Sequence, residues 1–324
     1  MDFEPNLTCS YAILKVYKDL FSFPNLSGVI MTTGTFDGVH VGHKQIINKL
    51  VTEAKEVGGQ TVMLTFFPHP RMVLFPDDHG LKLLNSPEEK AFLLEKAGID
   101  HLIIQPFSKE FSRLNPGNYI RDILVNTLHV RKMVVGYDHR FGRNREGNIE
   151  DLKEFTELYG YQVEEIAAQE VSDIRVSSTK IRLALEQGDV DSAAEFLGYN
   201  YMLSGTVEHG DGLGRKIGFP TANVSQEFDW KMVPGNGVYA AWVKIEEETL
   251  PAMVNIGTRP TVTSSDEVRI EAHIIDWNGD LYEKKIRLEF VSRLRSEKSF
   301  DSIESLARQL QADKQNALSK LRSE

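Results

Sequence analysis

The sequence predicts a doubly wound α/β domain over residues 1–184 and an antiparallel β domain, a barrel or a sandwich, over residues 185–324. Three observations predict this arrangement. The length of 324 residues corresponds to about two ordinary domains. Strand-like and helix-like segments alternate in the first half with short connections, as in a parallel sheet that helices cover on both faces. In the second half, strand-like runs follow one another without an intervening helix.

The strands of the predicted parallel sheet are short apolar runs that alternate with helical patterns. They are Gly28–Thr33, Thr61–Phe66, His101–Ile104, Lys132–Val135 and Gln162–Ile166. The helices are marked by apolar residues at helical spacing or by a capping sequence. They cover about residues 46–57, 86–97, a stretch that begins at 115, and 149–159.

The second domain is predicted from β-branched and aromatic runs that Gly, Pro, Asn and Asp separate. These runs are Met202–Glu208, Gly237–Ile245, Leu250–Asn255, Arg269–Ile275 and Lys285–Val291. Two short helices, over 180–187 and 189–197, are predicted to precede them. A closing helix over Ser302–Leu321 directs Ile303, Leu306, Leu310, Ala317 and Leu321 toward a core.

The composition excludes several classes of protein. Lys and Arg total 37 and Asp and Glu total 47, which gives a net charge of −10. Because binding to duplex nucleic acid needs a broad basic field, nucleic acid is not expected as the main partner. The longest uncharged stretch, residues 20–36, is short and rich in polar residues, so no membrane span is expected. One cysteine, Cys9, and acids in the first four residues favour a reducing cytoplasm over secretion.

The richest local signal is the run Gly34–His43, which reads GTFDGVHVGH and joins the first predicted strand to the first helix. An open α/β sheet binds its ligands at this position, and the N–H groups of the helix start attract phosphate. Gly42 allows a phosphate to approach the backbone. His40 and His43 can donate hydrogen bonds to phosphate oxygens as charge builds during displacement at phosphorus. Their spacing, with no cysteine nearby, only weakly indicates zinc.

Two further runs have phosphate-handling chemistry. Ser178 and Thr179 at a helix start, with Arg182 on its first turn, can form a phosphate clamp, although a simple helix cap also explains the hydroxyls. The run 210–223 is rich in glycine and then basic, which permits close backbone approach to phosphates, although a β-turn also explains its glycines. It ends with Thr221 and Asn223, whose oxygens suit Mg²⁺.

The run Gly34–His43 resembles the H-x-G-H signature of nucleotidylyltransferases. Its longer form resembles the FAD synthetase module of the bacterial bifunctional riboflavin kinase/FMN adenylyltransferase family, and Phe67–Leu74, Val135–Gly142 and Val176–Arg182 resemble later motifs of that module in the same order. The resemblance implies a Rossmann-like first domain. It implies that His40 and His43 contact ATP phosphates, that Asp138 lies at the ATP/flavin site, and that Ser178, Thr179 and Arg182 hold the triphosphate. The other nucleotide-binding residues that it implies there are Gly34, Phe36, Asp37, Gly38 and Gly42.

The run Gly214–Asn223, GRKIGFPTAN, is similar to the GRxxGFPTAN signature of riboflavin kinase, and residues 254–261 and 271–282 resemble the next kinase motifs. The resemblance implies a β-barrel kinase domain with a C-terminal helix. Its implied nucleotide-binding residues are Gly214, Arg215, Gly218 and Pro220, and its implied Mg²⁺ ligands are Thr221 and Asn223. Glu271 would be the general base that accepts the proton of the ribityl hydroxyl. From the sequence alone, solvent exposure also explains this mid-strand acid.

The resemblance covers about residues 12–318 and implies two reactions. The second domain phosphorylates riboflavin with ATP and Mg²⁺ to give FMN, and the first transfers AMP from a second ATP to FMN, giving FAD and pyrophosphate. The expected partners are ATP, riboflavin and FMN, and weak self-association stays open. Three positions depart from the family pattern: His139 replaces a usual Phe, Glu283 a usual Gly, and Tyr199–Asn200 a usual Arg-Pro.

Two other functions stay open at this point. The H-x-G-H motif alone specifies nucleotidyl transfer and not flavin, so transfer of AMP or CMP to another phosphorylated metabolite is a second hypothesis. A flavin-sensing module without catalysis is a third, which His139 and Glu283 motivate and which the full set of catalytic-type residues disfavours.

Overall fold

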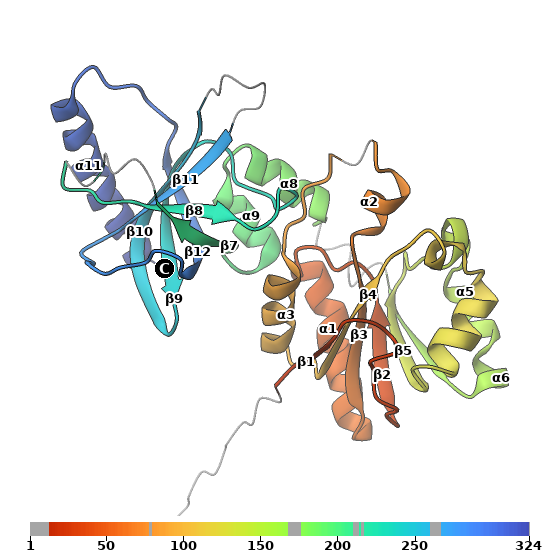
Figure 1. Cartoon of the computed structure of the whole chain (residues 1–324). Coiled ribbons are helices and arrows are strands. Elements are labelled where there is room, and N and C mark those ends of the chain that lie inside the picture. Colours follow the sequence, from red (N-terminus) through yellow and green to blue (C-terminus); the bar gives the residue numbers. More distant parts are fainter. Residues whose placement is uncertain are drawn as a thin grey trace, which may run out of the picture. The chain divides into compact units, whose positions relative to one another are not determined.

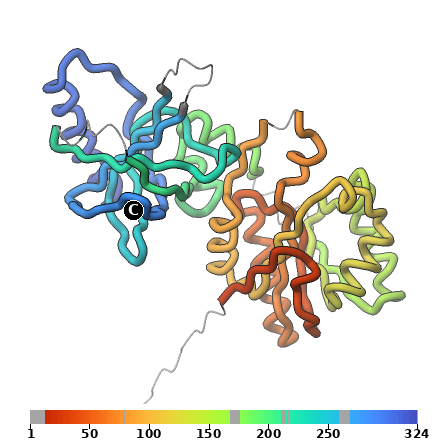
Figure 2. The backbone as a smooth tube through the Cα atoms, viewed as in Figure 1, coloured from red at the N-terminus to blue at the C-terminus, as the bar shows by residue number. Residues whose placement is uncertain are grey.

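The structure is a computed structural model that describes residues 13–77, 80–167, 176–209, 214, 217–259 and 267–323. The described chain divides into two compact units (Figure 1). The first contains the described residues up to Leu81 and those from Pro87 to 167. The second contains Lys82–Ser86 and the described residues from Val176 onward. In Figure 2 the chain can be followed from the first unit, in red to green, into the second, in green to blue.

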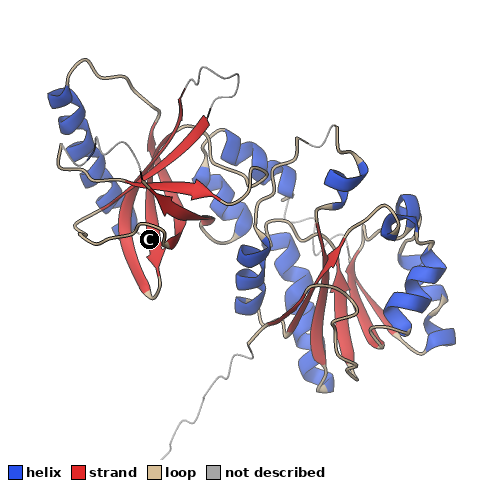
Figure 3. Cartoon of the chain, in the orientation of Figure 1, coloured by secondary structure: helices blue, strands red, loops and turns tan. Residues whose placement is uncertain are grey.

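The first unit contains a six-stranded parallel sheet in the order β1-β4-β3-β2-β5-β6. Its strands are β1 (Lys15–Tyr17), β2 (Val29–Thr33), β3 (Gln60–Phe67), β4 (His101–Pro106), β5 (Val130–Gly136) and β6 (Gln162–Ile166). Its helices are α1 (Val41–Val57), α2 (Pro70–Leu74), α3 (Pro87–Lys96), η1 (Phe111–Arg113), α4 (Pro116–Asn118), η2 (Tyr119–Val125), η3 (Arg143–Arg145), α5 (Ile149–Glu154) and α6 (Thr156–Tyr159). Helices α1 and α3 lie on one face of the sheet and α5 and α6 on the other (Figure 3), so the predicted doubly wound fold is confirmed.

Local chemistry explains these elements. All five residues of β2 are buried, as expected for a central strand of a parallel sheet. Helix α1 ends at Gly58, whose φ of 61° is a left-handed conformation that glycine adopts without strain. The five predicted strands of this sheet agree with the structure to within two residues. The three-residue β1 was not predicted, because so short a run carries no clear period. The helix predicted from 115 is a single α turn followed by the π-type turn η2.

The second unit is built on a closed barrel in the order β10-β11-β8-β7-β12-β9, with antiparallel pairing throughout. Its strands are β7 (Tyr201–Glu208), β8 (Ala222–Gln226), β9 (Gly237–Ile245), β10 (Glu248–Arg259), β11 (Glu267–Ile274) and β12 (Lys285–Arg295). Its helices are α8 (Ser178–Glu186), α9 (Val190–Leu197) and α11 (Ile303–Arg322). The closed barrel confirms the β-barrel that the family resemblance implies, and it decides between the barrel and the sandwich that the strand pattern alone leaves open.

The two faces of the barrel strands have different environments. Val254, Ile256 and Ala272 belong to the large interior core, together with Leu84, Ile181 and Leu185. Residues of the other face, Met253 and Ala240, pack against Ala317 and Leu321 of α11. Strand β8 is not predicted by the sequence pattern, because it directly follows the glycine-rich run, which indicates a ligand loop. Helix α11 begins at the Ser302 cap, as predicted.

Five residues from the first half of the sequence, Lys82–Ser86, are part of the second unit. Leu83 forms a parallel bridge with Lys231, and its N–H donates to the carbonyl of Trp230 at 2.7 Å. The ammonium of Lys231, a residue that is 4% exposed, donates to the carbonyl of Leu84 at 2.6 Å and to the hydroxyl of Tyr201 at 2.8 Å. The segment is therefore held by a buried lysine, and the second unit is not continuous in sequence.

Candidate functional site

The run Gly34–His43 lies at the point where the strand order of the parallel sheet reverses. The chain passes from β2 to β3 and β4 on one side and returns to β5 on the other side of β2. Ligands bind at such a switch point, beyond the carboxyl ends of the strands. The turn between β2 and α1 contains three residues with left-handed φ: Phe36 at 43°, Gly38 at 89° and Val39 at 37°. Phe36 and Asp37 are both buried, so the turn is anchored against the domain.

His40 and His43 form one compact pair at the start of α1. His40 is the N-cap residue, and its Nδ1 accepts a hydrogen bond from the backbone N–H of His43 at 3.3 Å. The two imidazole rings stack with their centroids 3.6 Å apart and their planes at 14°. The ring of His43 also lies 5.0 Å from that of Phe36. The helix start therefore holds both rings in one orientation.

The protonation of this pair follows from its surroundings. Burial lowers the pKa of His40 to about 4, and the charge of Asp37 opposes this shift only in part. Burial also lowers the pKa of His43 well below its usual range, and His40 and Lys90 lower it further. Both imidazoles are therefore neutral at pH 7. Because Nδ1 of His40 accepts a hydrogen bond, its single proton lies on Nε2, which is a directed hydrogen-bond donor.

A cavity of about 620 Å³ opens beside this pair. Gly34, Phe36 and His43 line it from the β2–α1 connection, and Asp138 and His139 line it from the segment after β5. Its remaining wall contains several aromatic side chains, among them Phe66, Phe107, Phe111, Tyr119 and Phe141, and also three arginines, Arg71, Arg140 and Arg145. A volume of this size, with aromatic walls and a few polar groups, suits a planar heterocyclic ligand. Four of the predicted first-domain residues thus line one cavity.

His139 is packed against an aromatic neighbour in this wall. Its ring stacks on that of Phe141, with centroids 5.8 Å apart and planes at 23°. Its Nε2 is buried and has no hydrogen-bond partner within the described part of the protein. Burial lowers the pKa of His139 to about 4. The histidine therefore acts as a neutral aromatic side chain, the role that a phenylalanine would fill.

Ser178, Thr179 and Arg182 lie at the start of α8, in the second unit. The helix is capped by Ser177, whose hydroxyl accepts from the N–H of Lys180 at 3.3 Å, so Ser178 and Thr179 are the first helical residues. Nε of Arg182 donates to the carbonyl of Lys82 at 2.6 Å. The role of these residues in holding a triphosphate stays a prediction.

The candidate site of the second unit is a row of polar residues across three barrel strands. Glu271 on β11 pairs with Asn223 on β8 and with Asn255 on β10. Residues that pair directly across antiparallel strands point to the same face, with Cβ atoms about 5 Å apart. Glu271 alternates with the buried core residues Ile270 and Ala272, so the row lies on the outer face of the barrel. The pairing thus places the carboxylate of Glu271 next to the amide of Asn223, both of which the sequence assigns to the kinase site.

The glycine-rich loop is held next to this row. Two of its predicted residues need to be glycine: Gly218 has a φ of 81°, and a Cβ on Gly214 would collide with the carbonyl oxygen of Phe219. The carbonyl of Pro220 lies 2.8 Å from Nδ1 of His273, which is two residues beyond Glu271 on the same face of β11. Thr221 follows and is exposed. Arg215 lies outside the described residues.

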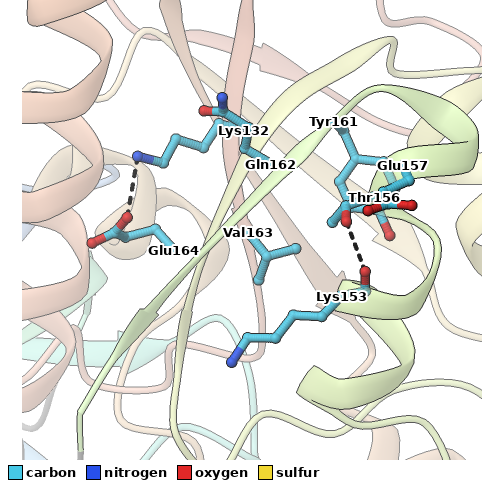
Figure 4. A pocket seen from close by; sticks show the side chains of 8 residues that line it. All are labelled: Lys132, Lys153, Thr156, Glu157, Tyr161, Gln162, Val163 and Glu164. Carbon is cyan, nitrogen blue, oxygen red and sulfur yellow. Dashed lines mark hydrogen bonds and ion pairs between the residues drawn. The ribbon is translucent and has the colours of Figure 1, made fainter.

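A second hollow, of about 540 Å³, lies at the β6 edge of the parallel sheet (Figure 4). Its cations are already paired: Lys132 with Glu53 at 2.6 Å and Glu164 at 3.2 Å, and Lys153 with Glu165 at 2.8 Å. Figure 4 also shows the hydrogen bond that the Thr156 hydroxyl donates to the Lys153 carbonyl. Because its charges are neutralised in place, this hollow does not offer a phosphate site.

Sequence reasoning missed three polar residues that the structure places at the two sites. Lys90 of α3 reaches the β2–α1 turn, Asn255 extends the Glu271 row, and His273 fixes the loop carbonyl. Asn255 and His273 could have been found, because they stand within the kinase-like motifs. Lys90 carries no such signal, because a lysine on a predicted amphipathic helix is usually solvated.

The fold and the two sites define a two-domain protein that handles nucleoside triphosphates, with a nucleotidyltransferase-type α/β domain and a barrel that carries a carboxylate beside a glycine-rich loop. The sequence matches the FAD synthetase family over residues 22–180 and the riboflavin kinase family over residues 197–321. The chain belongs to the family of bifunctional riboflavin kinase/FMN adenylyltransferases.

Individual relatives agree with this assignment. The bifunctional riboflavin kinase/FMN adenylyltransferase of Listeria monocytogenes is 36% identical over 89% of this chain and 90% of its own. That of Escherichia coli K12 is 36% identical over 90% of this chain and 92% of its own. A crystal structure titled a macrolide-efflux protein from Streptococcus pneumoniae aligns with a TM-score of 0.84 and 30% identity, over 94% of this chain and 98% of that one. Within the described ranges, no helix of this protein has the length and apolar character that crossing a membrane requires.

Proposed function

We propose that the two reactions of this family take place at the two sites described above, adenylyl transfer in the first unit and riboflavin phosphorylation on the barrel. The observation that carries the proposal is that each unit holds its own set of phosphate-handling groups. The neutral His40–His43 pair stands at a helix start beside an aromatic cavity. Glu271 is paired in register with Asn223, beside a loop whose backbone requires glycine at Gly214 and Gly218.

In the first unit, the aromatic cavity binds the flavin ring of FMN, and the α1 start binds the triphosphate of ATP. A phosphate oxygen of FMN attacks the α-phosphorus of ATP, the bond to the bridging oxygen breaks, and pyrophosphate leaves. The Nε2–H of His40 donates to a phosphate oxygen and stabilises the charge that builds there. That Ser178, Thr179 and Arg182 hold a triphosphate stays a prediction from the family resemblance, since these three residues belong to the second unit.

On the barrel, the carboxylate of Glu271 accepts the proton of the ribityl 5′-hydroxyl as that oxygen attacks the γ-phosphorus of ATP. Thr221 and Asn223 fit Mg²⁺, because hydroxyl and amide oxygens suit a hard cation and Asn223 lies directly beside Glu271. When bound there, Mg²⁺ would neutralise phosphate charge. Gly214, Gly218, Pro220 and Arg215 are proposed to contact the phosphates. The cytoplasmic location stays a prediction from composition.

An ATP/Mg²⁺ assay that follows FMN and FAD separately tests the division of labour. We expect His40→Ala to lower FAD formation from FMN by about 10²–10³-fold, the usual loss for one charge-stabilising donor, while riboflavin phosphorylation is unchanged. We expect Glu271→Gln to abolish FMN formation from riboflavin while FAD still forms from supplied FMN. Equal loss of both activities in either variant contradicts two separate sites.

The same assay decides between the alternatives. If the wild-type protein converts riboflavin to FMN and FAD, it is not a flavin sensor without catalysis. If it forms FMN but does not adenylylate it, incubation with other phosphorylated acceptors and with CTP tests the second nucleotidyl-transfer hypothesis.

A further inference from the structure

The ammonium of Lys90 lies behind the turn that carries the candidate adenylyl-transfer residues. Lys90 is in the first half of α3, and its Nζ donates to the carbonyl of Thr35 at 2.7 Å. It also lies 3.4 Å from the hydroxyl of Thr65 on β3, which itself donates to the Thr35 carbonyl at 3.2 Å. Thr35 sits between Gly34 and Phe36, and all three line the cavity, so both donors fix the backbone of the turn at the cavity wall.

The charge of Lys90 acts on the same small group of residues. Burial lowers the pKa of the ammonium to about 8, which Asp37 in the turn partly opposes. On the α1 side the ammonium faces His43, whose proton affinity it reduces. An amine that has lost most of its water and sits close to a phosphate-binding helix start exerts a stronger field there than a surface lysine, because little solvent screens it.

A lysine is a costly choice if the only need is to hold a carbonyl. Thr65 already donates to that carbonyl, and burial of an ammonium is unfavourable unless its charge is used or paired. The carboxylate of Asp37 in the turn is one anion that acts on this charge. The same turn leads into the N-terminus of α1, where a bound phosphate would be a second.

We propose that Lys90 is a positioning residue of adenylyl transfer, which holds the Gly34–Gly38 turn through the Thr35 carbonyl and supplies positive charge behind the triphosphate subsite. This inference rests on the proposed function of the first unit. Lys90 acts through the turn and does not itself touch the reacting phosphorus.

Steady-state kinetics of the full-length protein test it, with FMN and ATP as substrates. Lys90→Met keeps most of the length of the unbranched side chain and removes the charge. We expect it to lower kcat/KM for ATP by about 10–100-fold, less than loss of a direct donor such as that of His40. We expect Lys90→Arg to retain more activity than Lys90→Met. Riboflavin phosphorylation in the same samples is expected to stay at the wild-type rate.

Lys96→Met is the matched control, because it makes the same change at an exposed position of the same helix, where the ammonium lies over Phe92. It is expected to leave both activities unchanged. In the wild-type protein kcat/KM for ATP is expected to fall above about pH 8 as Lys90 loses its proton, and this limb is expected to disappear in Lys90→Met.

The outcomes separate the inference from the proposed function. If wild-type protein makes no FAD from FMN, the proposed function of the first unit fails. If it does, and Lys90→Met lowers only the melting temperature while kcat/KM per folded molecule and the pH profile match the wild type, Lys90 is merely structural and the inference is overturned. A Lys90→Arg variant as impaired as Lys90→Met also contradicts the role of the charge.

Discussion

At the first site, the protonation state of individual side chains determines which hydrogen bonds they can make. The histidine pair is neutral because burial disfavours imidazolium, and the N-cap bond fixes the tautomer of His40. Sequence reasoning predicted that both histidines donate to phosphate, and the structure supplies the reason why one donor atom is defined. It could not supply the neighbouring Lys90, because nothing in the local sequence indicates which way a helical lysine points.

His139 leads to a prediction about pH. Its folded-state pKa of about 4 lies below the ordinary value of 6.5, so its neutral form stabilises the first unit fully above pH 6.5, and this contribution is lost as the pH falls toward 4. We expect His139→Phe to remove that loss. When the pH is lowered from 7 to 4.5, the variant is therefore expected to lose about 2 kcal/mol less unfolding free energy than the wild type.

Urea unfolding followed by far-UV circular dichroism at several pH values measures this difference. Phe141, the stacking partner, stays in place, so the packing changes little. Two unfolding curves that shift in parallel with pH would show that His139 is not buried as a neutral group. His40 and His43 are expected to keep part of the acid sensitivity in both proteins.

At the scale of elements, the sequence predicted most strands and the helices α1, α3 and α11 because each has a clear hydrophobic period or cap. It missed β8 (Ala222–Gln226), because Asn223 falls in a run whose pattern indicates only a ligand loop. It also missed the ion pair that anchors α11: Nη2 of Arg295 on β12 lies 2.8 Å from the carboxylate of Asp313, a residue that is 1% exposed. Such a pair depends on how a helix docks, which no local pattern encodes.

We expect Asp313→Ala to destabilise the barrel by about 3 kcal/mol, because it leaves the guanidinium of Arg295, whose side chain is only 13% exposed, without its partner. Asp276→Ala is the control. It breaks the ion pair with Lys314 on the same helix, but Asp276 is largely exposed, so the expected loss is below about 1 kcal/mol. All three tryptophans are in the second half, so their fluorescence during urea unfolding reports on this unit. Equal losses in the two variants would contradict a special role of the buried pair.

For the whole molecule, the main finding is that the barrel unit includes residues 82–86. The boundary at residue 184 stays a prediction about where one activity ends. The two compact units divide between residues 167 and 176, and the five residues 82–86 belong to the second unit. Leu84 is fully buried in the barrel core, and its carbonyl accepts from Lys231. A change in the first half of the sequence is therefore expected to destabilise the second unit.

We expect Leu84→Ala to lower the stability of the barrel by about 2–4 kcal/mol through the cavity that it leaves. Tryptophan fluorescence during urea unfolding measures this loss. Leu94→Ala, at a fully buried position of α3 in the first unit, is the matched control and is expected to leave the tryptophan transition in place. A tryptophan transition that Leu84→Ala does not move would place Leu84 outside the barrel core.

By itself, the sequence determined the two fold classes, the family and the two sets of candidate residues, because hydrophobic periods and contiguous motifs are local properties of the chain. Only the tertiary structure decided that Asn255 and Asn223 flank Glu271 in one register, that Lys90 reaches the β2–α1 turn, and that residues 82–86 belong to the barrel unit. The physical reason is that register, burial and the loss of water around a charge arise from contacts between distant segments.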